Sequence, residues 1–223
     1  MRVAALYDIH ANLPALDAVL AEVDADVMVI GGDFVMGPWP AETLERLRAL
    51  EGDVRFIRGN ADREVVEEKQ GLAPPELTEF VRARLSPDAF AFLRELPLTV
   101  SVDGVLFCHA TPRNDEEIFT RISPDERWRA ALAGVDEHVV VCGHTHIQFD
   151  RRVDEVRLVN AGSIGMPYED EPGAYWAVLD DGDVEFRRTV YEPGDLSAWP
   201  GEWPEASPDE ATELFEKMSL ERG

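Results

Sequence analysis

The chain has 223 residues, of which 45% are apolar, and its 21 basic and 45 acidic residues give a formal charge of −24. This length predicts one compact domain with a full core. A surface of this charge disfavours stable binding to nucleic-acid phosphates, and no apolar run reaches the roughly 18 residues that a membrane span needs. We therefore expect a cytoplasmic protein without nucleic-acid or membrane partners. Whether it forms a homo-oligomer stays an open question.

Short apolar runs alternate with amphipathic stretches in the first part of the chain. The runs cover residues 2–7, 26–30 and 54–57. Between them, residues 13–23 and 41–50 repeat apolar side chains at spacings of three and four, which is typical of helices packed on one face. The pattern predicts a β-α-β-α-β opening.

A charged, more helical block over residues 63–95 is followed by a half that is rich in strands. The predicted strands cover residues 99–102, 105–107, 139–141, 148–152, 156–159, 175–179 and 184–190. Asp103-Gly104 predicts a hairpin turn, and residues 125–132 predict a helix. The fold class is therefore α/β, with two mixed sheets flanked by helices.

The last part of the chain has a different composition. From residue 192 it is rich in Pro, Gly, Glu and Trp, and it ends in a predicted helix over residues 208–220. We expect one domain over residues 1–191 and an acidic extension, residues 192–223, packed on it. Trp199 and Trp203 are expected to anchor this extension as buried hydrophobic side chains.

Polar side chains cluster where predicted strands end, several of them after a glycine. They are Asp8 and His10, Asp33 after Gly31-Gly32, Asn60 after Gly59, His109, and His144 and His146 after Gly143. In α/β sheets, ligands bind beyond the carboxyl ends of strands, so these side chains are expected to meet at one site. Each segment alone is weak support for such a site, whereas the complete set in this order is strong support for it.

Carboxylates, a carboxamide and imidazoles form a mixed oxygen and nitrogen donor set. Such a set fits Mn, Fe, Zn, Ni or Co better than Ca or Mg. Asp8 and His10 are two residues apart and share one face of an extended chain, as do His144 and His146. Asp33 or Asp8 is suited to bridge two cations. A pair of cations about 4 Å apart would activate a bridging water and polarise a phosphoester.

These motifs resemble the calcineurin-like metallophosphoesterase superfamily, and in particular its small bacterial and archaeal phosphodiesterase branch. The resemblance covers roughly residues 1–190 and implies a four-layer α/β/β/α sandwich. It implies two divalent transition metal ions, with manganese favoured, and hydrolysis of a small phosphoester by a metal-bridging hydroxide. One metal would be held by Asp8, His10, Asp33 and His146, and the other by Asp33, Asn60, His109 and His144.

One motif departs from the family pattern. Many members have a histidine directly after the asparagine of the third motif, where it helps to protonate the leaving group, but this chain has Ala61 there. His138 is expected at the wrong end of its strand to replace it. We therefore expect a preference for esters with good leaving groups, because general-acid assistance is typically worth ~10²–10⁴-fold.

Two other functions stay open. A protein or small-molecule phosphomonoesterase would use the same site, although residues 33–39 lack the arginine of the protein-phosphatase branch. A catalytically weak metal-binding scaffold is the second alternative. Phosphodiesterase activity is the leading prediction.

Several further residues have candidate roles. Asp33, Asn60 and His109 are expected to take part in catalysis as well as in metal binding, and Arg113 either contacts a substrate phosphate or is a solvated loop residue. Asn12 is expected to cap a helix, with a phosphate contact as the alternative. Residues 160–163 are expected to pack the ligand loops.

Overall fold

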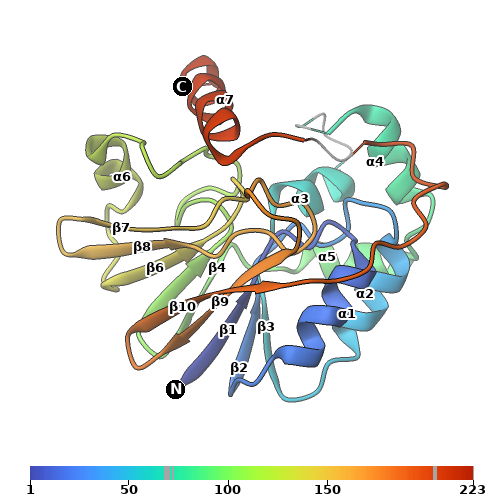
Figure 1. The fold of residues 1–223 in the computed structure, drawn as a ribbon, viewed down its shortest axis with the longest axis horizontal. Helices are drawn as coiled ribbons and strands as arrows, with labels where there is room; N and C mark the ends of the chain where they lie inside the picture. Colours follow the sequence, from blue (N-terminus) through green and yellow to red (C-terminus); the bar gives the residue numbers. More distant parts are fainter. Residues whose placement is uncertain (68–70, 72, 203–204, 223) are drawn as a thin grey trace.

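The computed structural model describes residues 1–67, 71, 73–202 and 205–222. Two five-stranded sheets lie face to face, and helices cover their outer faces (Figure 1). This arrangement confirms the predicted α/β class and the four-layer α/β/β/α sandwich. It follows from the strand pattern, because a sheet that is apolar on both faces must be covered on both.

The first sheet has the strand order β10-β9-β1-β2-β3. Its strands are β1 (Arg2–Leu6), β2 (Val27–Ile30), β3 (Asp53–Phe56), β9 (Ala174–Asp180) and β10 (Asp183–Thr189). β1, β2 and β3 are parallel, with Leu6 opposite Ile30 and Ile30 opposite Phe56. β9 and β10 form an antiparallel hairpin on the free side of β1. The parallel strands therefore end at one edge of the sheet.

The second sheet has the strand order β4-β5-β6-β8-β7. Its strands are β4 (Thr99–Val102), β5 (Val105–Cys108), β6 (Val139–Cys142), β7 (Phe149–Val153) and β8 (Val156–Asn160). β5, β6 and β8 are parallel, while β4 and β7 pair antiparallel at the two margins. The hairpin predicted at Asp103-Gly104 joins β4 to β5.

Seven helices complete the described part of the chain. They are α1 (Leu13–Glu22), α2 (Pro40–Arg48), α3 (Asn60–Glu67), α4 (Pro75–Arg82), α5 (Pro87–Arg94), α6 (Asp125–Ala131) and α7 (Pro208–Arg222). The predicted helical block consists of α3, α4 and α5, and its residues 68–70 and 72 lie outside the described residues. In the described part of the chain, no helix combines the length and the apolar composition needed to cross a bilayer.

The side chains of a strand point alternately to its two faces, and this divides the core into layers. Val3, Ala5 and Tyr7 of the β1 segment point to the layer between the sheets, while Ala4 and Leu6 point to the layer under α1, α2, α3 and α5. A third apolar cluster lies between the second sheet and α6. Three apolar layers thus hold the two sheets and their helices together. This packing fixes the strand ends of the two sheets relative to each other.

The C-terminal segment runs over the N-terminal part of the fold. The hydroxyl of Tyr191 accepts a hydrogen bond from the Asn12 side chain, and the Trp199 ring lies 5.1 Å from the ring of Phe80 in α4. The contact of Trp199 agrees with the predicted anchor, whereas Trp203 lies outside the described residues. Figure 1 shows α7 beyond this segment, near the carboxyl ends of the strands.

Candidate metal centre

The predicted site residues follow the carboxyl ends of five parallel strands. The ligand candidates come after β1 (Asp8, His10), β2 (Asp33), β3 (Asn60), β5 (His109) and β6 (His144, His146). Each of these side chains is buried, with a residue exposure between 0% and 6%. Burying this many polar groups is costly unless they are paired or bind a cation. Their position therefore indicates a binding function.

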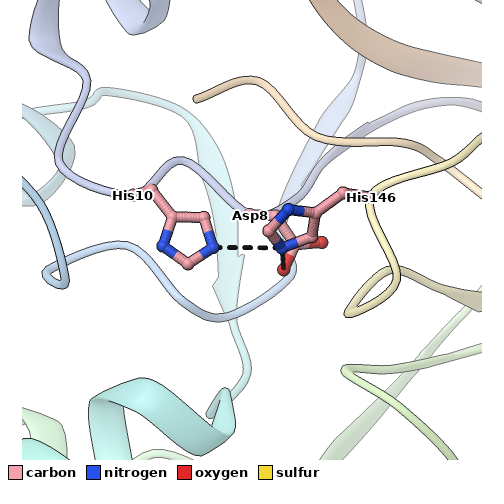
Figure 2. Close-up of side chains that lie close together, drawn as sticks. All are labelled: Asp8, His10 and His146. Atoms are coloured by element: carbon pink, nitrogen blue, oxygen red, sulfur yellow. Dashed lines mark hydrogen bonds and ion pairs between the residues drawn. The ribbon is translucent and has the colours of Figure 1, made fainter. Parts of the chain in front are cut away.

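The structure brings six of these residues together in two groups. Asp8, His10 and His146 form the first group, and Asp33, His109 and His144 form the second. Within each group the ligand atoms lie within 4.8 Å of one another. Figure 2 shows the side chains of the first group pointing toward one another. The seventh residue, Asn60, adjoins the second group, with its Oδ1 3.2 Å from His109 Nε2.

Two imidazole nitrogens face each other in the first group. His10 Nε2 lies 3.1 Å from His146 Nε2, and His146 Nε2 lies 3.2 Å from Asp8 Oδ1. The Nδ1 atom of each ring lies beside a carbonyl, that of Met36 at 3.0 Å and that of Met166 at 2.7 Å, so Nδ1 carries the proton. The two Nε2 lone pairs then point at each other. A cation between them would turn this repulsion into binding.

Two buried ligand atoms, one in each group, lack a hydrogen-bond partner within the described chain. Among the described residues, His144 Nε2 is fully buried and has no hydrogen-bond partner, and the same holds for Asp8 Oδ1. His109 Nδ1 donates to the Gly31 carbonyl at 2.9 Å, which leaves its Nε2 3.4 Å from Asp33 Oδ2. Unpaired buried donors and acceptors are rare in native proteins. These two atoms fit a bound metal.

One carboxylate oxygen lies near both groups. Asp33 Oδ2 is 3.4 Å from His109 Nε2 in the second group and 4.0 Å from His10 Nε2 in the first. The other oxygen, Oδ1, accepts the main-chain N–H of Ala61 at 2.8 Å. That bond orients the carboxylate. The geometry suits Asp33 to a position between two cations.

The electrostatics keep most of these groups in the form that binds metal. Burial and the neighbouring His146 lower the pKa of His10 to about 4, and burial with the nearby His109 lowers the pKa of His144 to about 4. The pKa of Asp33 is lowered well below its usual range, because the adjacent histidines outweigh its burial. At neutral pH these imidazoles are therefore uncharged and this carboxylate is ionised.

His109 behaves differently from the other histidines. Burial lowers its pKa, but Asp33 and Asp8 raise it more strongly, to about 10. The two carboxylates thus attract a positive charge to the centre, and a proton on His109 supplies it when no cation is there. A bound cation would displace that proton.

Sequence reasoning missed the role of Asp62. Its buried carboxylate accepts the main-chain N–H groups of Asp33 at 2.8 Å, Phe34 at 3.1 Å, Val35 at 3.3 Å and Gly59 at 3.1 Å. Burial and the charge of Asp33 raise its pKa to about 7, despite these bonds. Asp62 therefore holds together the loops that carry Asp33 and Asn60. The signal was an acidic residue two positions after a ligand, in a segment that had to be buried.

The ligand loops are strained, and close contacts fix them. Five candidate ligands have positive φ angles, namely Asp8 (50°), His10 (47°), Asp33 (53°), His144 (66°) and His146 (57°). Such backbone is uncommon outside glycine, and it persists only where the surroundings enforce it. At Gly143, a Cβ atom would lie 2.2 Å from Asp8 Oδ2, so only glycine allows this approach. The strain is concentrated at the centre.

The Asn160–Ser163 turn packs the ligand loops as predicted. Asn160 Nδ2 donates to the Gly143 carbonyl at 2.6 Å, and the Ser163 hydroxyl donates to the Asp8 carbonyl at 2.7 Å. Asn12 caps α1, since its Oδ1 accepts the N–H of Ala15 at 3.3 Å. That bond confirms the cap interpretation, and the amide group of Asn12 donates to the Gly165 carbonyl at 3.1 Å.

Two further residues were considered at the sequence level. The Arg113 guanidinium pairs with Glu117 and donates to the Ala130 carbonyl at 2.9 Å, and its contact with a substrate phosphate stays a prediction. His138 is exposed and directly precedes β6, at the end of the strand opposite to His144. The side chain of Ala61 is buried in the apolar core.

Comparison with known proteins agrees with this geometry. The sequence model of the calcineurin-like phosphoesterase superfamily domain matches residues 1–182. The chain is 26% identical over 191 residues to the phosphodiesterase YfcE of Escherichia coli K12, covering 78% of this chain and 85% of YfcE. It is 27% identical over 222 residues to the uncharacterized protein MJ0912 of Methanocaldococcus jannaschii, and the match covers 85% of this chain and 88% of MJ0912.

A solved structure shows the same fold. The metallophosphoesterase from Sphaerobacter thermophilus superposes with a TM-score of 0.73 at 24% identity, covering 86% of this chain and 90% of that one. The family binds divalent metals, and the two groups are the candidate sites for them in this structure. The chain therefore belongs to the calcineurin-like phosphoesterase superfamily.

Proposed function

We propose that the protein hydrolyses phosphodiesters with a pair of divalent transition metal ions. The observation that carries this proposal is the pair of adjoining, fully buried donor groups, in which His144 Nε2 and Asp8 Oδ1 have no hydrogen-bond partner among the described residues. A site built only for stability would pair these atoms. Neighbouring cations are the partners that suit both oxygen and imidazole donors.

The two groups would hold the ions in a defined way. Asp8, His10 and His146 would hold one ion, while His109, His144 and the Asn60 oxygen would hold the other, with Asp33 shared. When bound, the two cations would supply an activated water and polarise the phosphoryl oxygens. Manganese is the ion that we expect to support the highest activity.

The protein's own residues orient these donors before any ion binds. The carbonyls of Met36, Gly31 and Met166 fix three imidazole rings by accepting from Nδ1. Glu64 accepts from Asn60 Nδ2 at 3.1 Å, so the amide turns its oxygen toward His109. Such preorganisation lowers the cost of binding both metal and transition state.

Two observations favour a phosphodiester over a phosphomonoester. YfcE, which shares 26% identity with this chain over most of its length, is a phosphodiesterase. The segment after Asp33 has no arginine, so one cationic group that would neutralise a doubly charged monoester is missing. The charge of −24 also disfavours highly anionic substrates, and we expect a small diester.

Hydrolysis of bis-p-nitrophenyl phosphate tests the proposal. Metal-stripped protein refilled with Mn²⁺ should hydrolyse this diester faster than p-nitrophenyl phosphate, and His144→Ala should lose the activity. His138→Ala is the matched control, because His138 is exposed at the far end of β6 and should leave turnover unchanged.

Other outcomes would identify the alternatives. Faster turnover of the monoester would establish a phosphomonoesterase with the same centre. Binding of metal without hydrolysis of either ester, also with nickel, zinc or cobalt, would establish a metal-binding scaffold and overturn the enzyme proposal.

A further inference from the structure

Two aromatic side chains in contact connect the C-terminal helix α7 to a candidate metal ligand. The ring of Tyr168 lies beside that of His146, with centroids 5.6 Å apart and planes inclined by 19°. Phe215 of α7 meets Tyr168 edge-on, with centroids 5.8 Å apart and an angle of 73°. We call Tyr168 and Phe215 the aromatic stack. It lies outside the set of residues predicted from the sequence.

The stack is fixed at its outer end because α7 is anchored. Glu216, next to Phe215, accepts hydrogen bonds from the Thr120 hydroxyl at 2.6 Å and from the Ser123 hydroxyl, and it pairs with Arg127 at 3.3 Å. The Glu216 side chain is only 18% exposed, which shelters this pair from screening. α7 therefore gives Phe215 a firm position.

The stack is also fixed at its inner end. The main-chain N–H of Tyr168 donates to the His146 carbonyl at 3.2 Å. Met166, two residues earlier, accepts from His146 Nδ1 at 2.7 Å. The Tyr168 hydroxyl has no hydrogen-bond partner among the residues that the structure describes, so the ring and not the hydroxyl makes the contact with His146.

The ring of Tyr168 adds to the orientation that one hydrogen bond gives His146. The bond to the Met166 carbonyl directs Nδ1, and the imidazole can still rock about its Cβ–Cγ bond within the range that this hydrogen bond allows. The flat face of Tyr168 packs on the imidazole and narrows this motion. With the plane set, His146 Nε2 faces Asp8 Oδ1 at 3.2 Å.

We propose that the aromatic stack positions His146 and thereby makes α7 part of the support of the first metal group. It raises the cation affinity of the Asp8, His10 and His146 group and leaves the Asp33, His109 and His144 group unaffected. This inference rests on the proposed function in one respect, namely that both groups bind cations. Tyr168 and Phe215 are positioning residues that act through His146.

Calorimetric titration of metal-free protein with Mn²⁺ alone tests the proposal. Tyr168→Ala should weaken the binding of one of two ions by about twofold to tenfold, which is the range of one aromatic contact. Tyr168→Phe keeps the ring and should bind as the wild type does. Phe215→Ala should weaken the binding of the same ion by a smaller factor. Its neighbour Leu214, which is 56% exposed, offers the matched control Leu214→Ala, with no effect expected.

A double-variant series assigns the effect to one group. In a His144→Ala background the first group is complete, and Tyr168→Ala should keep its effect on Mn²⁺ affinity. In a His146→Ala background the ring that Tyr168 positions is missing, and the effect should vanish. An equal effect in both backgrounds would overturn the proposal, because it would show general loosening of the fold.

The outcome separates this inference from the function on which it rests. If the wild type binds two Mn²⁺ ions and both Tyr168→Ala and Phe215→Ala bind them equally well, only the positioning role is overturned. If the wild type binds no Mn²⁺, the proposed function fails as well. Should Tyr168→Ala not fold, Tyr168→Leu and Phe215→Ala provide the same test.

Discussion

The two sheets contribute different chemistry to the candidate centre. The loops of the first sheet supply both carboxylates, the amide and one imidazole, whereas those of the second sheet supply three imidazoles, namely His109, His144 and His146. The first-sheet loops are bonded to one another, since His10 N–H donates to the Asp33 carbonyl at 2.8 Å and Asp8 N–H to the Gly32 carbonyl at 3.2 Å. These bonded first-sheet loops form a template, to which the Ser163 hydroxyl after β8 adds a bond at the Asp8 carbonyl.

Two of the three second-sheet histidines depend on that template. His109 Nδ1 donates to the Gly31 carbonyl, and the main-chain N–H of His144 donates to Asp8 Oδ2 at 2.8 Å. His146 is oriented by residues 166 and 168 instead. Damage to the first-sheet loops should therefore disturb both metal groups, whereas damage on the second sheet should stay local. The following variants test this difference.

The largest effect is expected for Asp62→Ala in the first-sheet template. The change leaves four main-chain N–H groups buried without an acceptor, at about 1–3 kcal/mol for each one that finds no water. We expect a loss of about 4 kcal/mol of unfolding free energy, measured by urea denaturation. Asp136→Ala, an exposed carboxylate, should change stability by less than about 0.5 kcal/mol. Equal effects would contradict the template role.

Asp33→Asn should remove activity while it keeps the shape of the side chain. The variant lacks the negative charge that lies near both groups, so Mn²⁺-dependent turnover of bis-p-nitrophenyl phosphate should fall by more than about a hundredfold. Asp17→Asn makes the same chemical change in an exposed pair with Arg46 and should leave turnover unchanged. Retained activity in Asp33→Asn would show that the two groups do not share this carboxylate.

Asp115→Ala should loosen the connection between the two sheets. Its carboxylate, 6% exposed, pairs with Arg58 at 2.9 Å and Arg63 at 3.0 Å, which flank Asn60, while Asp115 itself lies on the loop after β5. We expect a loss of about 2 kcal/mol in unfolding free energy near pH 7. Arg63 and Arg58 pair with Asp115 and outweigh its burial, so its pKa lies below 3.8.

The pH dependence gives a second measurement on this variant. A lowered folded-state pKa means that the ionised carboxylate stabilises the fold above the unfolded-state value, and that this stability is lost as the pH falls through the folded-state value. The difference between wild type and Asp115→Ala should therefore shrink as the pH falls below about 4. A difference that stayed constant down to pH 2 would show that the pairs with arginine do not cause it.

The smallest effect is expected for Ala61→His. The wild type should prefer nitrophenyl esters over alkyl esters, because no histidine follows Asn60. A histidine at position 61 should raise kcat on an alkyl ester by about tenfold, below the full range of general-acid catalysis, because Ala61 is 5% exposed and packs in the core. Ala61→Asn, which cannot donate this proton, is the control. Equal turnover of both ester classes by the wild type would reveal another acid.

The ligand candidates were predictable because each one follows a short apolar run directly or within a few residues. At Asp33, Asn60 and His144 a glycine also marks the strand end, and the order of these segments repeats a known family pattern. Asp62 carries only the weaker signal of an acidic residue two positions after a ligand, and Tyr168 carries none. Their partners are Asp33, 29 positions earlier, and His146, 22 positions earlier, so only the folded chain reveals the contacts.

By itself, the sequence determined the α/β class, the strands and helices, and the donor residues at the strand ends, because periodicity and turn chemistry act over a few residues. The tertiary structure alone decided the order of the strands within the two sheets and that the Asn12 amide donates to the distant Gly165 carbonyl. It also decided which donors face each other. These features depend on contacts between residues far apart in the chain, which form only when the apolar layers pack.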